Sequence, residues 1–448
     1  MKKVRKLIVI LLSIIMVMTL SACAPSDPAP AAPDDPAPAA QDDPADPAEE
    51  PADDPAPAAP DTVLTIWTLQ QHDGDVQGAQ ERAVEAFEVE HNVSVEVTAF
   101  PYEMLRDRLL VALAGGEGPD ILMMDQIWVG QYAAAGWVIP IDDRLAASDI
   151  NREDFFEGAW GAGSYLGQYY GVPFDVGVWA FLYYNRDMFR EVGLDPYSPP
   201  TTWDEMLEIG EQLMGDNRYG TAIWVGTGDA VQCMTNAFIH SGGGQIVSED
   251  NTRGLLNCEA GVAALDFWKA LDEISPAGSV GRTEEDSFAL FTSGLVGMFF
   301  YGEWGQETIA ARAPDMDYGM ALLPIPEGGQ SIGTFGGFLL GINAVSEHQD
   351  LAWEFIEFVS TKENNMAMAG LTPAHREAAR TFLQENRLFP DIIYEQLTTA
   401  GFRPSVPNYP ELAEIQRRAT EQVLLDVADS QTALDEAAAA IDELLRAR

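Results

Sequence analysis

Lysine is nearly missing from this chain beyond its first residues. The 448-residue sequence has 25 Lys and Arg against 71 Asp and Glu, and after residue 61 its lysines are Lys269 and Lys362. Four basic residues lie in 1–22 and eleven acidic residues in 23–61, which leaves a net charge of −39 on residues 62–448. A body this acidic repels the phosphates of nucleic acids and of anionic membranes. We therefore expect no nucleic-acid partner.

Cysteine and histidine are also scarce. The five histidines are scattered, and the sequence has no CxxC or HExxH motif. Because protein zinc sites need closely spaced ligands of this kind, we expect no metal and no other cofactor. Of the three cysteines, Cys233 and Cys258 lie far from the N-terminus. Outside the cytosol they could form a disulfide; the alternative is two separate buried thiols.

Long apolar runs are missing except near the N-terminus. Residues 7–20, LIVILLSIIMVMTL, follow a segment with four basic residues. This run is shorter than the about 20 residues that cross a bilayer. A basic segment followed by a short apolar one is typical of a secretory signal. The alternative interpretation is an N-terminal transmembrane anchor.

The four residues LSAC, at 20–23, end this segment. They resemble the lipobox of bacterial lipoproteins. The resemblance implies a signal peptide over residues 1–22, cleavage before Cys23, and acyl chains such as palmitate on Cys23. Several acyl chains anchor a protein stably to a membrane. The protein would then lie in the cell envelope and face the extracellular or periplasmic side.

Residues 24–61 consist mainly of Pro, Ala and Asp and have no aromatic or β-branched residue to bury. Such a segment cannot offset the entropy lost on ordering. Together with Cys23 it forms a predicted disordered tether, residues 23–61. The remaining 390 or so residues exceed one ordinary core, so two domains are expected.

The first part of this body alternates strand and helix patterns. β-Branched and apolar runs predict strands at 62–69, 93–100 and 119–125, and apolar residues at helical spacing predict helices within 76–92 and 103–116. This alternation predicts an α/β fold with a mainly parallel sheet. Ligands of such sheets bind beyond the carboxyl ends of the strands. The residues expected there are Trp67, Gln70, Gln71 and His72 after the first strand, and Asp125, Gln126 and Trp128 after the third.

Several segments occur in an order that points to one family. They are AFEVEHNVSVEV, GPDILMMDQIWVGQYAAAGWVIPID, GVPFDVGVWAFLYYNRDMFREVGL, TTWDEMLEIGEQL, DSFALFTSGLVGMFFYGEW, YGMALLPIPEGG and LAWEFIEFVSTKENN. The series resembles the extracellular solute-binding proteins of ABC importers, in their carbohydrate-binding branch. The resemblance covers residues 62–448. It implies a monomeric, non-enzymatic protein that captures a sugar or oligosaccharide and delivers it to the subunits of a permease.

The same resemblance implies a two-lobe, type II periplasmic-binding-protein-like fold with the ligand cleft between the lobes. Lobe 1 would comprise residues 62–172 plus 322–366, and lobe 2 residues 173–321 plus 367–448. Ligand binding would close the lobes by a hinge motion.

Candidate ligand contacts follow from the chemistry of a sugar, because an indole covers the apolar face of the ring and planar polar groups bind its hydroxyls. The candidates are Trp67, Trp128, Trp179, Trp224 and Trp304 for the face, and Gln71, Asp125, Asp175, Glu303 and Arg403 for the hydroxyls. Gly337 would let the backbone approach the ligand. Each has a structural alternative: a core position for the tryptophans, a hinge role for Asp175, a turn for Gly337, and a salt bridge for Arg403.

Two other functions stay open at this point. Acidic groups beside aromatic rings also suit a polyamine or another cation, through cation–π contact. A secreted glycoside hydrolase would need two carboxylates about 5–10 Å apart, which Asp125, Asp175 and Glu303 could supply. No motif of a hydrolase accompanies them, so binding without catalysis is the preferred interpretation.

Overall fold

The computed structural model describes residues 62–70, 74–226 and 230–447. All of these belong to one compact unit, Ala59–Arg448. The expected signal peptide, Cys23, the tether, Gln71 and His72 lie outside the described residues. Among the helices of the described part, none is both long and apolar enough to cross a membrane.

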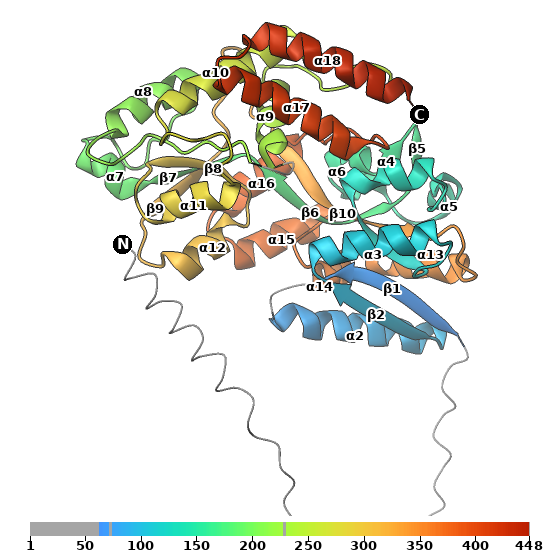
Figure 1. Ribbon diagram of the computed structural model, residues 1–448. Coiled ribbons are helices and arrows are strands. Elements are labelled where there is room, and N and C mark those ends of the chain that lie inside the picture. The colour runs from blue at the N-terminus through green and yellow to red at the C-terminus, as the bar shows by residue number, and fades with distance from the viewer. Residues whose placement is uncertain (1–61, 71–73, 227–229, 448) are drawn as a thin grey trace, which may run out of the picture. The chain divides into compact units, whose positions relative to one another are not determined.

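A six-stranded sheet runs through the centre of this unit (Figure 1). The three strands predicted from the sequence are confirmed, but the mainly parallel sheet is not. β1 pairs in parallel with β2 and β3, whereas three other pairings are antiparallel. In order across the sheet, the strands are β11 (Thr372–Pro373), β6 (Val172–Trp179), β10 (Thr334–Ile342), β3 (Ile121–Asp125), β1 (Val63–Leu69) and β2 (Ser94–Phe100).

The insertion of β10 explains the mixed sheet. This strand arrives late in the chain and lies between β3 and β6, antiparallel to both. An antiparallel neighbour needs no crossover helix, so β10 can come from a remote part of the sequence. The alternation of strands and helices that predicts parallel pairing is confined to β1, β2 and β3.

Helices account for most of the remaining chain. They are α2 (Gly74–His91), α3 (Tyr102–Ala114), α4 (Gln126–Ala134), α5 (Asp142–Ala147), α6 (Glu157–Ala162), α7 (Arg186–Glu191), α8 (Trp203–Leu213), α9 (Ala230–Ser241), α10 (Glu259–Glu273), α11 (Glu284–Thr292), α12 (Gly305–Arg312), α13 (Gln349–Val359), α14 (Lys362–Met368), α15 (Arg376–Asn386), α16 (Pro390–Thr399), α17 (Tyr409–Leu424) and α18 (Ser430–Arg446). A 3-10 turn, η1, spans Arg152–Asp154.

Local sequence sets many helix ends. Thr202 and Thr283 begin α8 and α11 with reciprocal capping boxes, which satisfy backbone N–H groups that a helix start leaves open. The helix α3 ends at Ala114, directly before Gly115 and Gly116. Gly116 has a φ of +73°, a conformation that favours glycine after a helix. The predicted helix end at these two glycines is therefore confirmed.

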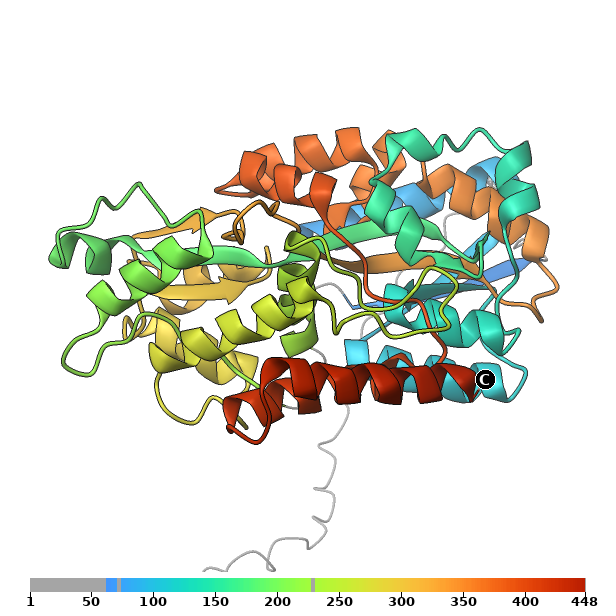
Figure 2. The same ribbon diagram turned by 90° about the horizontal axis from the view of Figure 1, so that it is seen from above.

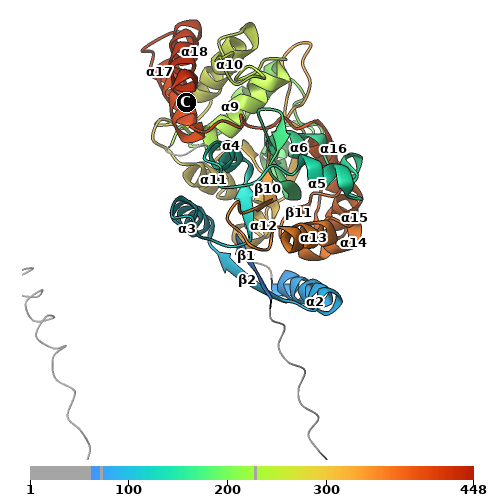
Figure 3. The ribbon, with the colours of Figure 1, turned by 90° about the vertical axis from the view of Figure 1, so that its right-hand side faces the viewer.

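Helices cover both faces of the six-stranded sheet (Figure 3). Alternate residues of β3 divide between two cores, as the two-residue period of a strand requires. Ile121 and Met123 pack in the core that includes α2 and α13, and Leu122 and Met124 pack in the core formed with α3 and α4. Every residue of β3 is buried. The packing of this strand therefore holds its last residue, Asp125, in a fixed position.

A second, three-stranded sheet has the order β8 (Met298–Tyr301), β7 (Phe181–Asn185) and β9 (Tyr318–Ala321), all antiparallel. Ala180 alone separates β7 from β6 of the first sheet, and its φ is +78°. The chain therefore passes directly from one sheet to the other through a single residue in a left-handed conformation. The division of the chain into two lobes at residues 172 and 173 stays a prediction.

Two further elements complete the unit. A hairpin of β4 (Ser164–Tyr165) and β5 (Gln168–Tyr169) stands apart from both sheets. The C-terminal helices α17 and α18 pack against each other (Figure 1), and the C-terminal helix runs along one edge of the unit when seen from above (Figure 2). The helix α17 contacts α9 and α10 as well as α4, so it links helices from the second half of the chain to the first sheet.

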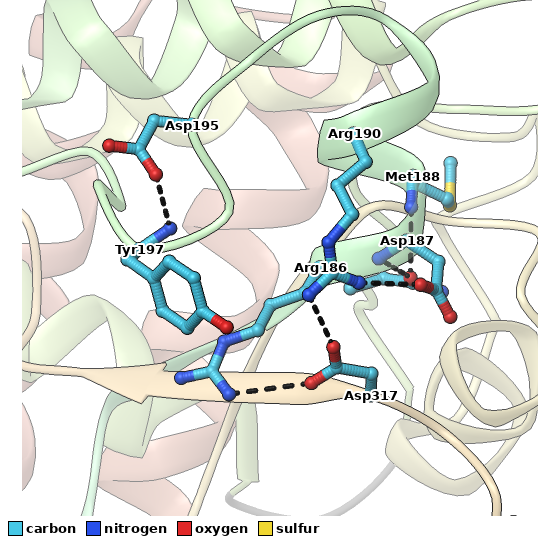
Figure 4. Close-up of polar contacts among 8 residues, drawn as sticks. Arg186, Asp187, Met188, Arg190, Asp195, Tyr197 and Asp317 are labelled. Carbon is cyan, nitrogen blue, oxygen red and sulfur yellow. Dashed lines mark hydrogen bonds and ion pairs between the residues drawn. The ribbon is translucent and has the colours of Figure 1, made fainter.

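A polar cluster fixes α7 beside β9 (Figure 4). Asn185 caps α7 by accepting hydrogen bonds from the backbone N–H groups of Asp187 and Met188. Asp317, directly before β9, pairs with Arg186 at 3.4 Å and with Arg190 at 2.6 Å. These ion pairs are partly exposed, so each contributes about 1 kcal/mol or less to stability.

Candidate functional site

Asp125 and Arg403 meet at the carboxyl end of β3. The carboxylate of Asp125 accepts hydrogen bonds from the hydroxyl of Tyr102 at 2.8 Å and from the backbone of Ile127 at 3.2 Å. Its Oδ1 atom also lies 3.3 Å from the guanidinium of Arg403. Both residues are 7% exposed. The salt bridge, which is the alternative for Arg403, is present. Contact of Asp125 and Arg403 with a ligand stays a prediction.

Two candidate tryptophans flank this pair. Trp67, on β1, is half-buried and packs edge-on against Phe100 at 5.3 Å between ring centroids. Trp128, on α4, is buried and packs against Tyr102 at 5.5 Å. The position of Trp128 corresponds to its core alternative, since α4 turns this side chain toward the hydrophobic cluster under β3. Contact of either residue with a ligand stays a prediction.

A second group of candidates gathers where β6 leaves the six-stranded sheet. Trp179, the last residue of β6, and Trp304, directly before α12, are both half-buried. Their rings meet edge to face, 4.6 Å apart and inclined by 85°. Tyr301 packs against both indoles, at 5.9 Å and 5.7 Å. Three aromatic rings from two sheets therefore form one corner, a suitable surface for the apolar face of a sugar.

Two buried carboxyl groups lie behind this corner. Glu303 is 2% exposed; its Oε1 accepts a hydrogen bond from the Thr372 hydroxyl at 2.7 Å, and its backbone N–H donates to Val178. Asp175 is 1% exposed. Burial raises the pKa of Asp175 to about 8 and the pKa of Glu303 to about 7, because a low-dielectric surrounding disfavours the charged form. Neither group is placed on the molecular surface to meet a solute directly.

The first residues of β10 join the two groups. Phe338 pairs with Asp125 of β3 on one side and with Asp175 of β6 on the other. The side-chain amide of Gln126 donates to the backbone oxygen of Phe335. Gly337 has a φ of +135°, which only glycine adopts readily. Its place between the two groups fits the expected close approach of backbone, although the contact it makes is with β6.

The last candidates lie elsewhere. Trp224 is 1% exposed and packs against Trp268 and Phe299, which matches its core alternative; its ligand role stays a prediction. Cys233 is buried in α9, and Cys258 is half-buried at the start of α10. The possible disulfide between Cys233 and Cys258, and its alternative of two separate buried thiols, stay predictions.

Two contacts of the site were not predicted from the sequence: Tyr102 binds Asp125, and Thr372 binds Glu303. Gln126, which binds Phe335, is among the residues expected at the end of the third strand. Tyr102 follows β2 as Asp125 follows β3, so the rule about carboxyl ends of strands could have found it. Thr372 gave no such signal. In the described residues, no three His, Cys, Asp or Glu side chains are grouped to hold a metal ion.

These two sheets and the helices around them define an α/β protein. Comparison with known proteins identifies the family. The sequence profile described as bacterial extracellular solute-binding protein matches residues 72–366. The chain belongs to this family, as the order of its sequence segments predicted.

Individual relatives agree with this assignment. The arabinooligosaccharide-binding protein of Bacillus subtilis is 24% identical over 310 residues, covering 68% of this chain and 70% of that protein. The galactooligosaccharide-binding protein of the same organism is 24% identical over 404 residues, covering 84% and 87%.

A solved structure supports the fold. An ABC transporter solute-binding protein from Thermotoga lettingae, bound with α-D-tagatose, superposes with a TM-score of 0.69 at 26% identity. The superposition covers 86% of this chain and 100% of that one. The predicted fold class, a two-lobe α/β fold of the periplasmic-binding-protein type, is thereby confirmed.

Proposed function

We propose that this chain is the solute-binding component of an ABC importer for a sugar or oligosaccharide. It captures the solute outside the cytoplasm as a monomer and delivers it to permease subunits, without catalysis. The observation that carries the ligand class is the aromatic corner of Trp179, Trp304 and Tyr301 in a chain whose relatives include two named oligosaccharide-binding proteins. Aromatic rings of this kind bind the C–H face of sugars.

Trp304→Ala tests the site. We expect the affinity for a bound sugar to fall about tenfold or more, since stacking on an aromatic ring is worth about 1–3 kcal/mol by analogy with nucleobases. Isothermal titration with arabino- and galacto-oligosaccharides measures it. Trp137→Ala is the matched control, because Trp137 is also half-buried but packs against Tyr132 beside α4. Equal affinity in the parent and in Trp304→Ala, for a sugar that binds, would remove Trp304 from the site.

The alternative ligand is a polyamine or another cation, favoured by the net charge of −46. Titration of the parent with spermidine in parallel separates the two classes. Binding of spermidine but of no sugar would replace the proposed ligand. Hydrolysis of a bound oligosaccharide by the parent would instead turn the proposal toward a glycoside hydrolase.

We propose further that Cys23 carries the lipid that holds the protein at the membrane, with residues 23–61 as the tether. Cys23→Ser in the full chain should move the protein from the membrane fraction to the soluble fraction of the cell envelope, because several acyl chains are needed for stable anchoring. Ligand affinity should stay that of the parent, since no candidate ligand contact lies in residues 23–61. A Ser variant that still sediments wholly with membranes contradicts the lipid anchor.

A further inference from the structure

Asp175 and Glu303 (the carboxyl pair) are held against the same edge of the six-stranded sheet. Asp175 lies in β6, opposite Pro373 of β11. Glu303 binds β6 through its backbone N–H and binds Thr372 of β11 through its carboxylate. The neighbour of Glu303 in the chain, Trp304, lies over Gly177 of β6, where an added Cβ would come 3.7 Å from the indole. The carboxyl pair thus stands where the segment carrying Trp304 meets β6.

Oε2 of Glu303 has no hydrogen-bond partner within the described part of the chain, and the carboxyl group of Asp175 meets only backbone groups, those of Phe338, Gly370 and Leu371, with no cation beside it. The side chains are nearly fully buried. A buried carboxylate without a partner is strongly unfavourable, whereas a protonated carboxyl group loses most of this cost. Burial therefore favours the protonated form of the carboxyl pair.

The charged groups around the carboxyl pair do not compensate it. The cation that faces Glu303 is Arg387, at the end of α15, and its guanidinium already pairs with Glu307 of α12 at 2.7 Å. The hydroxyl of Tyr183, in β7, donates a hydrogen bond to the backbone oxygen of Gly302 at 2.9 Å, so it does not donate to the carboxyl pair. Backbone hydrogen bonds from Phe338 in β10 and from Gly370 and Leu371 before β11 lower the pKa of Asp175, but the effect of burial, which raises it, is larger. Ionisation of both acids would thus leave two negative charges together.

We propose that the carboxyl pair is a proton-dependent lock between β6 and the segment that carries Trp304. With protons bound, the two neutral groups stay packed and Trp304 is fixed against Trp179. When both protons leave, repulsion and desolvation loosen residues 302–305 from β6. Since Trp304 belongs to the proposed sugar site, this part of the inference rests on the proposed function: ligand affinity should fall in alkaline solution.

The sign of the effect follows from proton linkage. Burial raises the pKa of Asp175 to about 8 and of Glu303 to about 7, above the usual values of about 4 in an unfolded chain. Between about pH 4 and about pH 8, Asp175 and Glu303 bind protons in the folded protein that the same residues have released in the unfolded chain. Stability from the carboxyl pair is therefore lost as the pH rises from about 4 to about 8.

The test compares the parent with the double variant Asp175→Asn/Glu303→Gln in ligand-free thermal unfolding. From pH 6 to pH 8.5, we expect the melting temperature of the parent to fall by about 3–6 °C relative to the double variant. Glu436→Gln is the control, because Glu436 is exposed on α18 and the substitution also replaces a carboxyl group by an amide; its curve should run parallel to the parent. Parallel curves for the double variant would overturn the lock.

Two more readouts keep the outcome decisive. Infrared spectroscopy of the parent should show the band of a protonated carboxyl group at pH 6 that disappears by pH 9; a parent without this band at pH 6 overturns the proposal even if the variants do not fold. For a sugar that binds, affinity should fall over the same range in the parent and stay constant in the double variant. If no sugar binds at any pH, the proposed function fails, while unfolding and infrared data still decide on the lock.

Discussion

Replacing Arg403 by methionine lowers the free energy of unfolding by about 3–5 kcal/mol. Methionine keeps the length of the side chain but removes the charge that faces Asp125 at 3.3 Å. Because both residues are buried, the Asp125 carboxylate would keep its charge out of water without the guanidinium that balances it, while its hydrogen bonds from the Tyr102 hydroxyl and the backbone N–H of Ile127 remain. Urea unfolding of the purified protein measures the loss.

Two controls separate this buried pair from ion pairs in general. Arg403→Met/Asp125→Asn removes both charges and should recover a large part of the loss, which a double-mutant cycle quantifies. Arg446→Met breaks an exposed pair with Asp442 on α18 and should cost about 1 kcal/mol or less. If Arg446→Met and Arg403→Met cost the same, the importance assigned to burial of the Asp125 pair is wrong.

Gly337→Ala should destabilise the protein by about 3 kcal/mol, the cost of forcing a residue with a Cβ into a glycine conformation plus a steric clash. Gly337 has a φ of +135°, and a Cβ there would come 2.4 Å from the backbone oxygen of Asp175. Since neighbouring strands cannot shift independently within a packed sheet, the clash has to be relieved by opening the β6–β10 ladder. The melting temperature and the urea midpoint report it.

The adjacent glycine gives the matched variant. Gly336→Ala would place its Cβ 3.6 Å from the backbone oxygen of Gly177, an ordinary van der Waals distance, and Gly336 has no positive φ. We expect a change within about 1 kcal/mol. A large loss in Gly336→Ala with little loss in Gly337→Ala would reverse the assignment of backbone strain in β10.

Sequence patterns predicted the elements of residues 62–125 well, because their structure is local. The strands β1, β2 and β3 and the helices α2 and α3 follow apolar periods of two and of about 3.6 residues, and Gly115 and Gly116 mark a helix end. Asp125 was found for the same reason, since its place after a buried apolar strand puts it at the edge where ligands of such sheets bind.

Long-range pairing was beyond these patterns. The contact between Asp125 and Arg403 joins residues 278 positions apart, and Thr372 meets Glu303 across 69 positions. The antiparallel insertion of β10 is also non-local, so no period within its own segment reveals it. Nor does composition tell a core tryptophan from a site tryptophan: Trp128 and Trp224 are buried, while Trp67, Trp179 and Trp304 keep part of their rings exposed.

The passage through Ala180 has a mechanical consequence. Because β6 and β7 are separated by this one residue, two torsion angles fix the direction in which the second sheet leaves the first. A residue with a Cβ has only a narrow energy well at positive φ, so this joint is stiff and resists twisting. If one sheet rotates against the other, we expect the backbone torsion angles of residues 322–333, the longer connection between β9 and β10, to change most. The torsion angles of Ala180 should change little.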